Sequence, residues 1–275
     1  MKINGKTIQV GWISGMPRSG TTWLSQIFAS CPDVRLKICP LFSYEFKNIL
    51  DESSSAQQWK KLFADVYQTN SDFLDQEYLR KQGLVPSFSE NNQHPGNLII
   101  KSNRFHNLVP HILKLNSEIR FIHIVRHPCA IIYSWLSNPL EFPENADPKM
   151  EWRSGQCRKN GPGEFWGFND WMQVTRQALH LNEQYPNRHR IIRYEDLARN
   201  PREQTQELFE YFQLPYGKQT RDFLELSHSR HDIHKRSVFK NPSKRDRWQK
   251  LIDPVIASEC IEKVKGTELE QFIRY

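Results

Sequence analysis

The sequence has no long hydrophobic run, few cysteines and no dense block of one charge. None of its apolar stretches approaches the about 18 residues that a membrane-spanning helix requires, and the mean hydropathy is −0.70. The first residues also lack an apolar leader and a small-residue cleavage site. We therefore expect a folded cytoplasmic protein without membrane partners, because 38% of its 275 residues are hydrophobic and can form a core.

Cysteines and charges exclude further classes of protein. The five cysteines are scattered, without the close pairs of a zinc site or the density of a disulfide scaffold. No His, Cys and Asp cluster has metal-ligand spacing, so we expect no metal. The net charge of +7 is spread along the chain, which favours a small polyanionic ligand over nucleic acid. The oligomeric state cannot be read from these patterns.

Short runs rich in Ile and Val alternate with longer helix-like stretches, which is typical of parallel strands joined by helical crossovers. We predict strands at 8–13, 98–101, 119–125 and 190–194, and helices at 21–30, 56–67, 108–115, 130–137, 165–184 and 202–212. The pattern predicts an α/β fold with a central parallel sheet flanked by helices. We expect a single domain over residues 1–275. Its least regular segment, 139–163, is either a lid-like or specificity loop or an ordinary surface excursion.

A glycine-bearing loop follows the first predicted strand and precedes a helix. Gly15 and Gly20 bracket four residues, as in the phosphate-loop pattern GxxxxGK[ST], whose backbone N–H groups surround a phosphate. Thr21 stands where that pattern has its lysine, which argues against an ordinary kinase or ATPase. Arg18 is the only cation of the loop. The alternative is a strand-to-helix turn that needs glycine for geometry only.

Residues 17–23, Pro-Arg-Ser-Gly-Thr-Thr-Trp, resemble the 5′-phosphosulfate loop of the sulfotransferases. The resemblance implies a P-loop-kinase-like three-layer fold. It also implies that 3′-phosphoadenosine 5′-phosphosulfate (PAPS) is the sulfuryl donor and adenosine 3′,5′-bisphosphate (PAP) is the product. The donor-binding residues that it implies in this loop are Arg18, Ser19, Gly20, Thr21, Thr22 and Trp23.

PAPS carries a 3′-phosphate that ATP lacks, so a second basic site is expected. Arg126 follows the predicted strand 119–125, at the strand end where ligands of open α/β sheets bind, and Ser134 lies eight residues later. A guanidinium and a hydroxyl can share one phosphate. This pair resembles the 3′-phosphate element of the sulfotransferases, although Arg126 could instead pair with a surface carboxylate.

Two further segments carry weaker resemblances. Tyr194, in Arg-Tyr-Glu-Asp-Leu after the last predicted strand, corresponds to a tyrosine that lies near the adenine in relatives; the two acids after it could simply cap a helix. Near the C-terminus, a basic segment with Trp248 matches only in part the family's element that closes over the 3′-phosphate. Lys244 and Arg245 are hypotheses for that role, and a solvated basic face is the alternative.

The general base has several candidates in the sequence. By the resemblance, Lys101 would contact the transferring group, while Asn103 stands where cytosolic relatives have a catalytic histidine. The remaining base candidates are His106 and Glu45, favoured equally, and more weakly His127. The cation of Arg18 would stabilise charge on the leaving group.

The leading function is therefore a PAPS-dependent sulfotransferase acting on a hydroxyl of a carbohydrate or a small molecule. Two alternatives stay open. One is a P-loop phosphotransferase with an unusual arrangement of cations, and the other is a non-catalytic nucleotide-binding protein that has lost its base.

Overall fold

The computed structural model describes residues 1–3, 5–240 and 246–274 and is built around a parallel β-sheet. The spatial order of its five strands is β4-β5-β3-β6-β7, and all neighbouring pairs are parallel. A short antiparallel hairpin of β1 and β2 precedes them. The strands are β1 Lys2–Ile3, β2 Lys6–Thr7, β3 Gln9–Ser14, β4 Val34–Ile38, β5 Asn97–Ser102, β6 Arg120–Val125 and β7 His189–Arg193.

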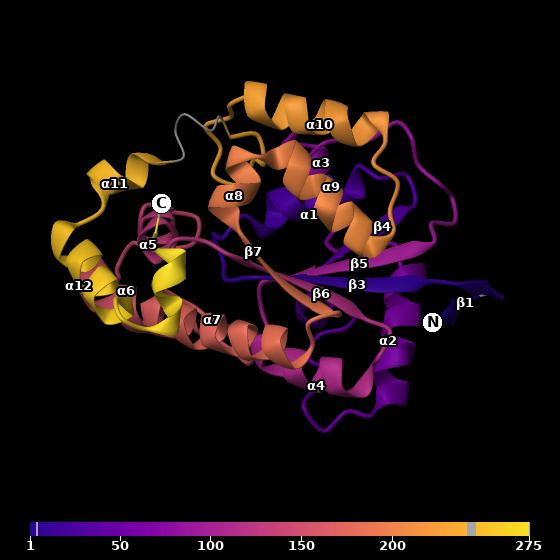
Figure 1. The fold of residues 1–275 in the computed structure, drawn as a ribbon, viewed down its shortest axis with the longest axis horizontal. Coiled ribbons are helices and arrows are strands. Elements are labelled where there is room, and N and C mark those ends of the chain that lie inside the picture. The colour runs from indigo at the N-terminus through magenta and orange to yellow at the C-terminus, as the bar shows by residue number, and fades with distance from the viewer. Residues whose placement is uncertain (4, 241–245, 275) are drawn as a thin grey trace.

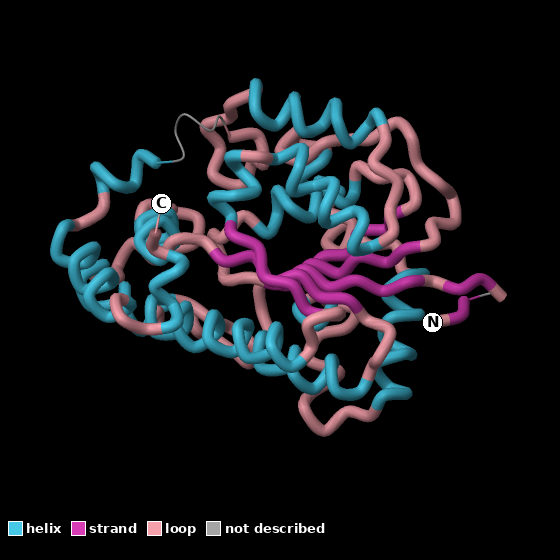
Figure 2. The backbone as a smooth tube through the Cα atoms, in the orientation of Figure 1, coloured by secondary structure: helices cyan, strands magenta, loops and turns pink. Residues whose placement is uncertain are grey.

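Helices cover both faces of this sheet, so the molecule has three layers (Figures 1 and 2). One layer contains α1, α9 and α10, and the opposite layer contains α2, α4 and α7 (Figure 1). The helices α5, α6, α11 and α12 lie together at the left of the view in Figure 1. The helices are α1 Thr21–Ala29, α2 Ala56–Gln68, α3 Glu77–Arg80, α4 Val109–Leu115, α5 Pro128–Leu136, α6 Pro148–Ser154, α7 Gly167–Gln184, α8 Tyr194–Arg199, α9 Pro201–Phe212, α10 Lys218–Ser229, α11 Trp248–Leu251 and α12 Pro254–Val264.

Alternating side chains of β3 contribute to two separate hydrophobic cores. In β3, Trp12 packs into the core beneath α2 and α4, while the next residue, Ile13, packs into the core with α1, α9 and α10. Successive side chains of a strand point to opposite faces, and both faces are covered here. This explains why the predicted strands contain adjacent apolar residues rather than a strict alternation of apolar and polar residues.

The four predicted strands and six predicted helices are confirmed, with ends that differ by one or two residues. The sequence interpretation missed β4. The segment 139–163 contains α6, which begins after Asp147; the carboxylate of this residue accepts a hydrogen bond from the backbone N–H of Lys149 (2.8 Å). Within the described part of the chain, no helix is both long enough and apolar enough to cross a bilayer.

The strand order brings the chemically interesting loops to one edge of the sheet. β3 lies in the middle and pairs with β5 and β6, and its last residue, Ser14, is level with Ser102 and His123. The carboxyl ends of parallel strands share an edge, so the loops after β3, β5 and β6 emerge side by side. Such edges are where open α/β sheets bind ligands.

Candidate active site

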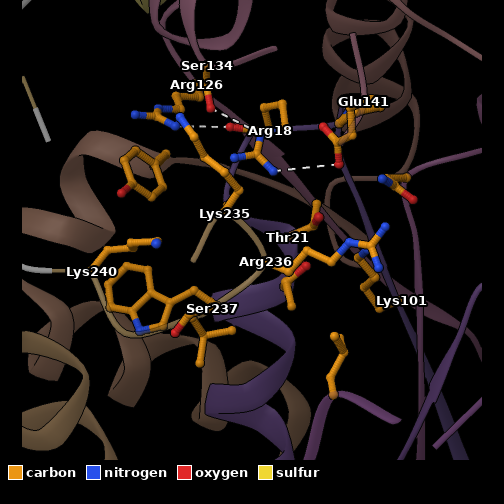
Figure 3. A pocket seen from close by; sticks show the side chains of 18 of the residues that line it. Arg18, Thr21, Lys101, Arg126, Ser134, Glu141, Lys235, Arg236, Ser237 and Lys240 are labelled. Carbon is orange, nitrogen blue, oxygen red and sulfur yellow. Dashed lines mark hydrogen bonds and ion pairs between the residues drawn. The ribbon is translucent and has the colours of Figure 1, made fainter. Parts of the chain in front are cut away.

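A cavity of about 690 Å³ opens at this edge (Figure 3). Its walls come from the loop between β3 and α1, the ends of β4 and β5, the helix α5, and the segment 231–240. Nine arginines and lysines line it against two carboxylates, Glu141 and Asp232, so the cavity is strongly electropositive. The nine cations are Arg18, Lys101, Arg104, Arg126, Arg158, Lys235, Arg236, Lys240 and Arg247.

The glycine-bearing loop is shaped by close contacts and by positive φ angles. Gly20 has φ +94°, and a Cβ at this position would lie 2.5 Å from the ring of Tyr194. Arg18 itself has φ +71°, a conformation that is uncommon for a residue with a side chain and that recurs at functional sites. The Ser19 hydroxyl donates to the carbonyl of Met16 (2.7 Å), so this buried side chain supports the loop instead of lining the cavity.

The two expected anion-binding elements are directly connected. The Arg18 Nε donates to the Ser134 Oγ (3.0 Å), and the Arg126 Nη1 donates to the Arg18 carbonyl (3.0 Å) (Figure 3). The Arg18 Nη1 also lies 3.6 Å from Glu141 Oε1. Burial and the positive charge of Arg126 lower the pKa of Arg18, and the negative charge of Glu141 raises it. All three predicted residues therefore lie on one face of one cavity.

Arg126 is fixed from several sides. Its carbonyl accepts a hydrogen bond from the Trp171 indole (3.0 Å), and its guanidinium lies 4.4 Å above the Tyr194 ring. Its Nε is buried without a hydrogen-bond partner within the described residues. Glu195, weighed above as a possible helix cap, instead accepts a hydrogen bond from the backbone N–H of His127 (3.0 Å) and so supports the turn after β6.

Aromatic side chains border the same side of the cavity. Trp23 meets Tyr194 edge to face at 6.2 Å, and its indole N–H donates to the Ser227 Oγ (3.1 Å). Thr21 and Thr22, in the first turn of α1, also line the cavity. The structure thus brings together most of the residues that the resemblance implied for the donor.

Lys101 ends up at the cavity wall near the carboxyl end of β5. The residue is only 5% exposed, and this burial lowers the pKa of its ammonium group. The positive charges of Arg104 and Arg18 lower the pKa of Lys101 further, whereas the negative charge of Glu141 raises it. Asn103 lines the cavity as well and accepts a hydrogen bond from the Cys39 thiol (3.4 Å). The position where relatives have a histidine is therefore at the cavity, but it holds an amide without basic character.

None of the three base candidates from the sequence lines this cavity. His106 is buried against Phe165 and His123, and burial lowers its pKa to about 3, so the ring is neutral. Glu45 is exposed, and a hydrogen bond with Ser71 lowers its pKa. His127 caps α5, with its Nδ1 accepting from the Cys129 N–H (3.2 Å).

The sequence interpretation missed the cations of the segment 231–240. Lys235, Arg236 and Lys240 line the cavity, a few residues before the chosen Lys244 and Arg245, which lie outside the described residues. Burial and the neighbouring Arg18 and Lys235 lower the pKa of Lys240 to about 8. The basic run His-Lys-Arg at 234–236 was the available signal. The carboxylate of Glu141, from the segment after α5, was also missed.

Within the described residues, no group of three or more His, Cys, Asp or Glu side chains is arranged to hold a metal ion. The cavity therefore offers cations, hydroxyls and backbone N–H groups. These groups bind anions and stabilise negative charge that develops during group transfer.

Comparisons with known proteins agree with this geometry. The model of a family described as "Sulfotransferase family" matches residues 12–218. The fold is similar to the sulfotransferase domain of the Synechococcus PCC 7002 olefin synthase (TM-score 0.54, 17% identity, covering 96% of this chain and 97% of that one). It is also similar to a sulfotransferase domain from the curacin biosynthetic pathway (TM-score 0.54, 18% identity, covering 95% of this chain and 99% of that one). A third similar structure is a mouse sulfotransferase complexed with PAP (TM-score 0.53, 14% identity, covering 96% of this chain and 88% of that one). No curated protein sequence matches the chain.

The structural likenesses show a shared fold, and with it the predicted P-loop-kinase-like three-layer architecture is confirmed. The family match covers well over half of the chain and includes both the phosphate loop and the Arg126–Ser134 element. This protein therefore belongs to the sulfotransferase family of enzymes.

Proposed function

We propose that the protein transfers a sulfuryl group from PAPS to a hydroxyl of a small molecule or carbohydrate. The observation that carries this proposal is the excess of cations in one cavity, with the phosphate loop and the Arg126–Ser134 element hydrogen-bonded to each other. Such an arrangement suits one ligand with two separate anionic groups. The PAP complex of a mouse protein with this fold supports the choice of donor.

The residues of the cavity fit that donor. The backbone of the loop around Gly20, with Arg18, Thr21 and Thr22, would hold the 5′-phosphosulfate at the N-terminus of α1. Arg126 and Ser134 would hold the 3′-phosphate, and the unpartnered Arg126 Nε is a donor that such a group would satisfy. Tyr194 and Trp23 would contact the adenine. Lys235 and Lys240 would add positive charge in the role first assigned to Lys244 and Arg245.

The chemistry follows from these positions. The S–O bond to the bridging oxygen breaks, and the negative charge that develops on that oxygen is stabilised by Arg18 and by the Thr21 hydroxyl. Lys101, at the end of β5, would contact the transferring group. Arg18 remains charged at all working pH values, so it stabilises charge without donating a proton.

The acceptor is a hydroxyl compound whose body lies against an aromatic wall. Phe42, Phe73, Tyr133 and Trp166 line the cavity in addition to the donor-side residues. Ring faces of this kind contact flat organic molecules and sugar rings alike. The proposal also places the enzyme in the cytoplasm and without a nucleic-acid partner.

Titration calorimetry with PAP and with ATP–Mg²⁺, followed by transfer of labelled sulfate from PAPS to a panel of alcohols, sugars and phenols, tests the proposal. We expect PAP to bind more tightly than ATP–Mg²⁺, because only PAP fills the Arg126–Ser134 element, and we expect transfer to at least one hydroxyl. Tighter binding of ATP–Mg²⁺ would favour the phosphotransferase. Tight PAP binding without transfer to any acceptor would favour the non-catalytic nucleotide-binding protein.

A further inference from the structure

Sulfuryl transfer to an uncharged hydroxyl requires a group that accepts the hydroxyl proton, and the cavity offers few such groups. Two carboxylates line it, Glu141 and Asp232. Asp232 is already engaged, because it accepts hydrogen bonds from Arg230 (2.9 and 2.8 Å) and from the Ser237 hydroxyl (2.7 Å). Of these two carboxylates, Glu141 is therefore the one whose side chain accepts no hydrogen bond within the described residues.

Two histidines, His228 and His231, also line the cavity. The His228 ring packs against Trp23 at 5.7 Å, and its Nδ1 lies 3.2 Å from the carbonyl of Leu224. His228 is therefore on the side of the proposed adenine contact, where no acceptor hydroxyl is expected. His231 belongs to the segment that supplies Lys235 and Lys240, the cations proposed to add charge at the 3′-phosphate.

Glu141 lies instead beside the two cations that would flank the transferring group. Figure 3 shows Glu141 and Lys101 on the side of Arg18 that faces away from Arg126. The Glu141 Oε1 is 3.6 Å from the Arg18 Nη1, and its charge also acts on Lys101. A base for the acceptor must be within reach of the atom that attacks sulfur, and this is the region between Arg18 and Lys101.

The backbone that carries this carboxylate is held in place although it belongs to a loop. The Glu141 N–H donates to the carbonyl of the fully buried Asn138 (2.9 Å). The next residue, Phe142, packs edge to face on Trp135 at 5.3 Å, and Trp135 packs on Trp166. The Glu141 Oε2 is buried and has no hydrogen-bond partner within the described residues. A buried oxygen without a donor is costly, and a hydroxyl placed against this carboxylate would relieve that cost.

We propose that Glu141 is the general base that takes the proton of the acceptor hydroxyl. This inference rests on the proposed function. The hydroxyl oxygen forms the new bond to sulfur, the bond from sulfur to the bridging phosphate oxygen breaks, and its electron pair leaves with PAP. The proton passes from the hydroxyl to the Glu141 carboxylate. Arg18, which pairs with Glu141, gains the donor's phosphosulfate as a second anionic partner.

The test compares acceptors that need a base with one that does not. Glu141→Gln keeps the shape of the side chain but removes its basicity, and Glu141→Asp keeps a carboxylate at a shorter reach. Glu144→Gln is the matched control, because Glu144 is an exposed glutamate of the same segment that does not line the cavity. The acceptors are the best alcohol of the panel and 4-nitrophenol, which is largely ionised at pH 8. PAP binding and thermal unfolding verify that each variant is folded.

We expect Glu141→Gln to lower kcat for the alcohol by at least about 100-fold, the lower end of general-base effects. The rate with 4-nitrophenol and the Kd for PAP should stay within about threefold of wild type. Glu141→Asp should recover part of the alcohol rate, and Glu144→Gln should resemble wild type. These results would support the assignment.

Equal losses with both acceptors, or an unchanged rate with the alcohol, would overturn the assignment of Glu141 as the base. If Glu141 only neutralised Arg18, the Glu141→Gln variant would change PAP affinity and affect both acceptors alike, which also overturns it. A wild-type protein that binds PAP but transfers sulfate to no alcohol would refute the base and leave the donor site standing. A wild-type protein that does not bind PAP would refute the proposed function itself.

Discussion

Removal of the Arg126 guanidinium tests how much the 3′-phosphate of the proposed donor contributes to binding, separately from its 5′-phosphosulfate. The Nη1 of this guanidinium holds the Arg18 carbonyl, its face lies on the Tyr194 ring, and its buried Nε has no partner within the described residues. Arg126→Ala should therefore remove the proposed contact to the 3′-phosphate and also loosen the phosphate loop. The two effects are distinguished by comparing PAP with AMP, which has the 5′-phosphate but lacks the 3′-phosphate.

The magnitude follows from the kind of hydrogen bond that is lost. A hydrogen bond to a charged group contributes about 1.5–3 kcal/mol, which corresponds to about 10- to 150-fold in affinity. Loss of the hydrogen bond to the Arg18 carbonyl should weaken the binding of PAP and the binding of AMP by a similar factor. We therefore expect the preference of the protein for PAP over AMP to fall by about 10- to 150-fold in Arg126→Ala. The Arg126→Lys variant keeps the charge but not the fork of donors, so it should retain part of the preference.

Titration calorimetry of both nucleotides against wild type and the two variants measures this preference directly, at one fixed salt concentration because charge contacts are screened by salt. Thermal unfolding verifies that the variants remain folded. An equal loss of affinity for PAP and AMP would mean that Arg126 acts only through the loop around Arg18, and the assignment of the 3′-phosphate site would then be wrong.

Two further predictions concern charge and backbone. The pKa of Lys240 is lowered to about 8, and only its protonated form attracts an anion, so PAP affinity should fall as pH rises from 7 to 9. Lys240→Arg stays charged, and calorimetry across this range should then show a flatter profile. Gly20→Ala should destabilise the fold by more than the about 1–2 kcal/mol of its positive φ, because its Cβ would meet Tyr194 at 2.5 Å. Gly217→Ala, in open space, is the control in urea unfolding, and equal stability of the two variants would contradict the argument.

Each strand that was predicted contains at least two adjacent apolar residues, even β7, His-Arg-Ile-Ile-Arg. The missed strand β4, Val-Arg-Leu-Lys-Ile, alternates apolar and cationic residues without such a pair and resembles a surface segment. Lys37 is nevertheless 1% exposed, because its ammonium pairs with Asp75 (2.7 Å) and donates to the carbonyl of Thr69 (2.5 Å). Those partners lie more than 30 residues away in the sequence, so no local pattern could show that this lysine is buried.

The position at the cavity of the residues proposed to bind the donor could be predicted, because Arg18 and Arg126 are each fixed relative to the end of a strand. Arg18 follows β3 and Arg126 follows β6, and a parallel sheet brings such positions to one edge whatever the rest of the chain does. A residue such as Glu141 has no such reference. Its place depends on Phe142 packing on Trp135 and on a buried Asn138, contacts that only the folded chain reveals.

The side chain of Arg18 makes the two halves of the cavity depend on each other. It hydrogen-bonds Ser134 of the proposed 3′-phosphate site and pairs with Glu141, the proposed base. The Ser134 hydroxyl accepts from the Arg18 Nε and can at the same time donate its proton to a 3′-phosphate, so this bond need not break when the donor binds. The same guanidinium, through its Nη1, would keep the Glu141 carboxylate beside the transferring group. Loss of the Arg18 side chain should therefore weaken donor binding and also misplace the proposed base.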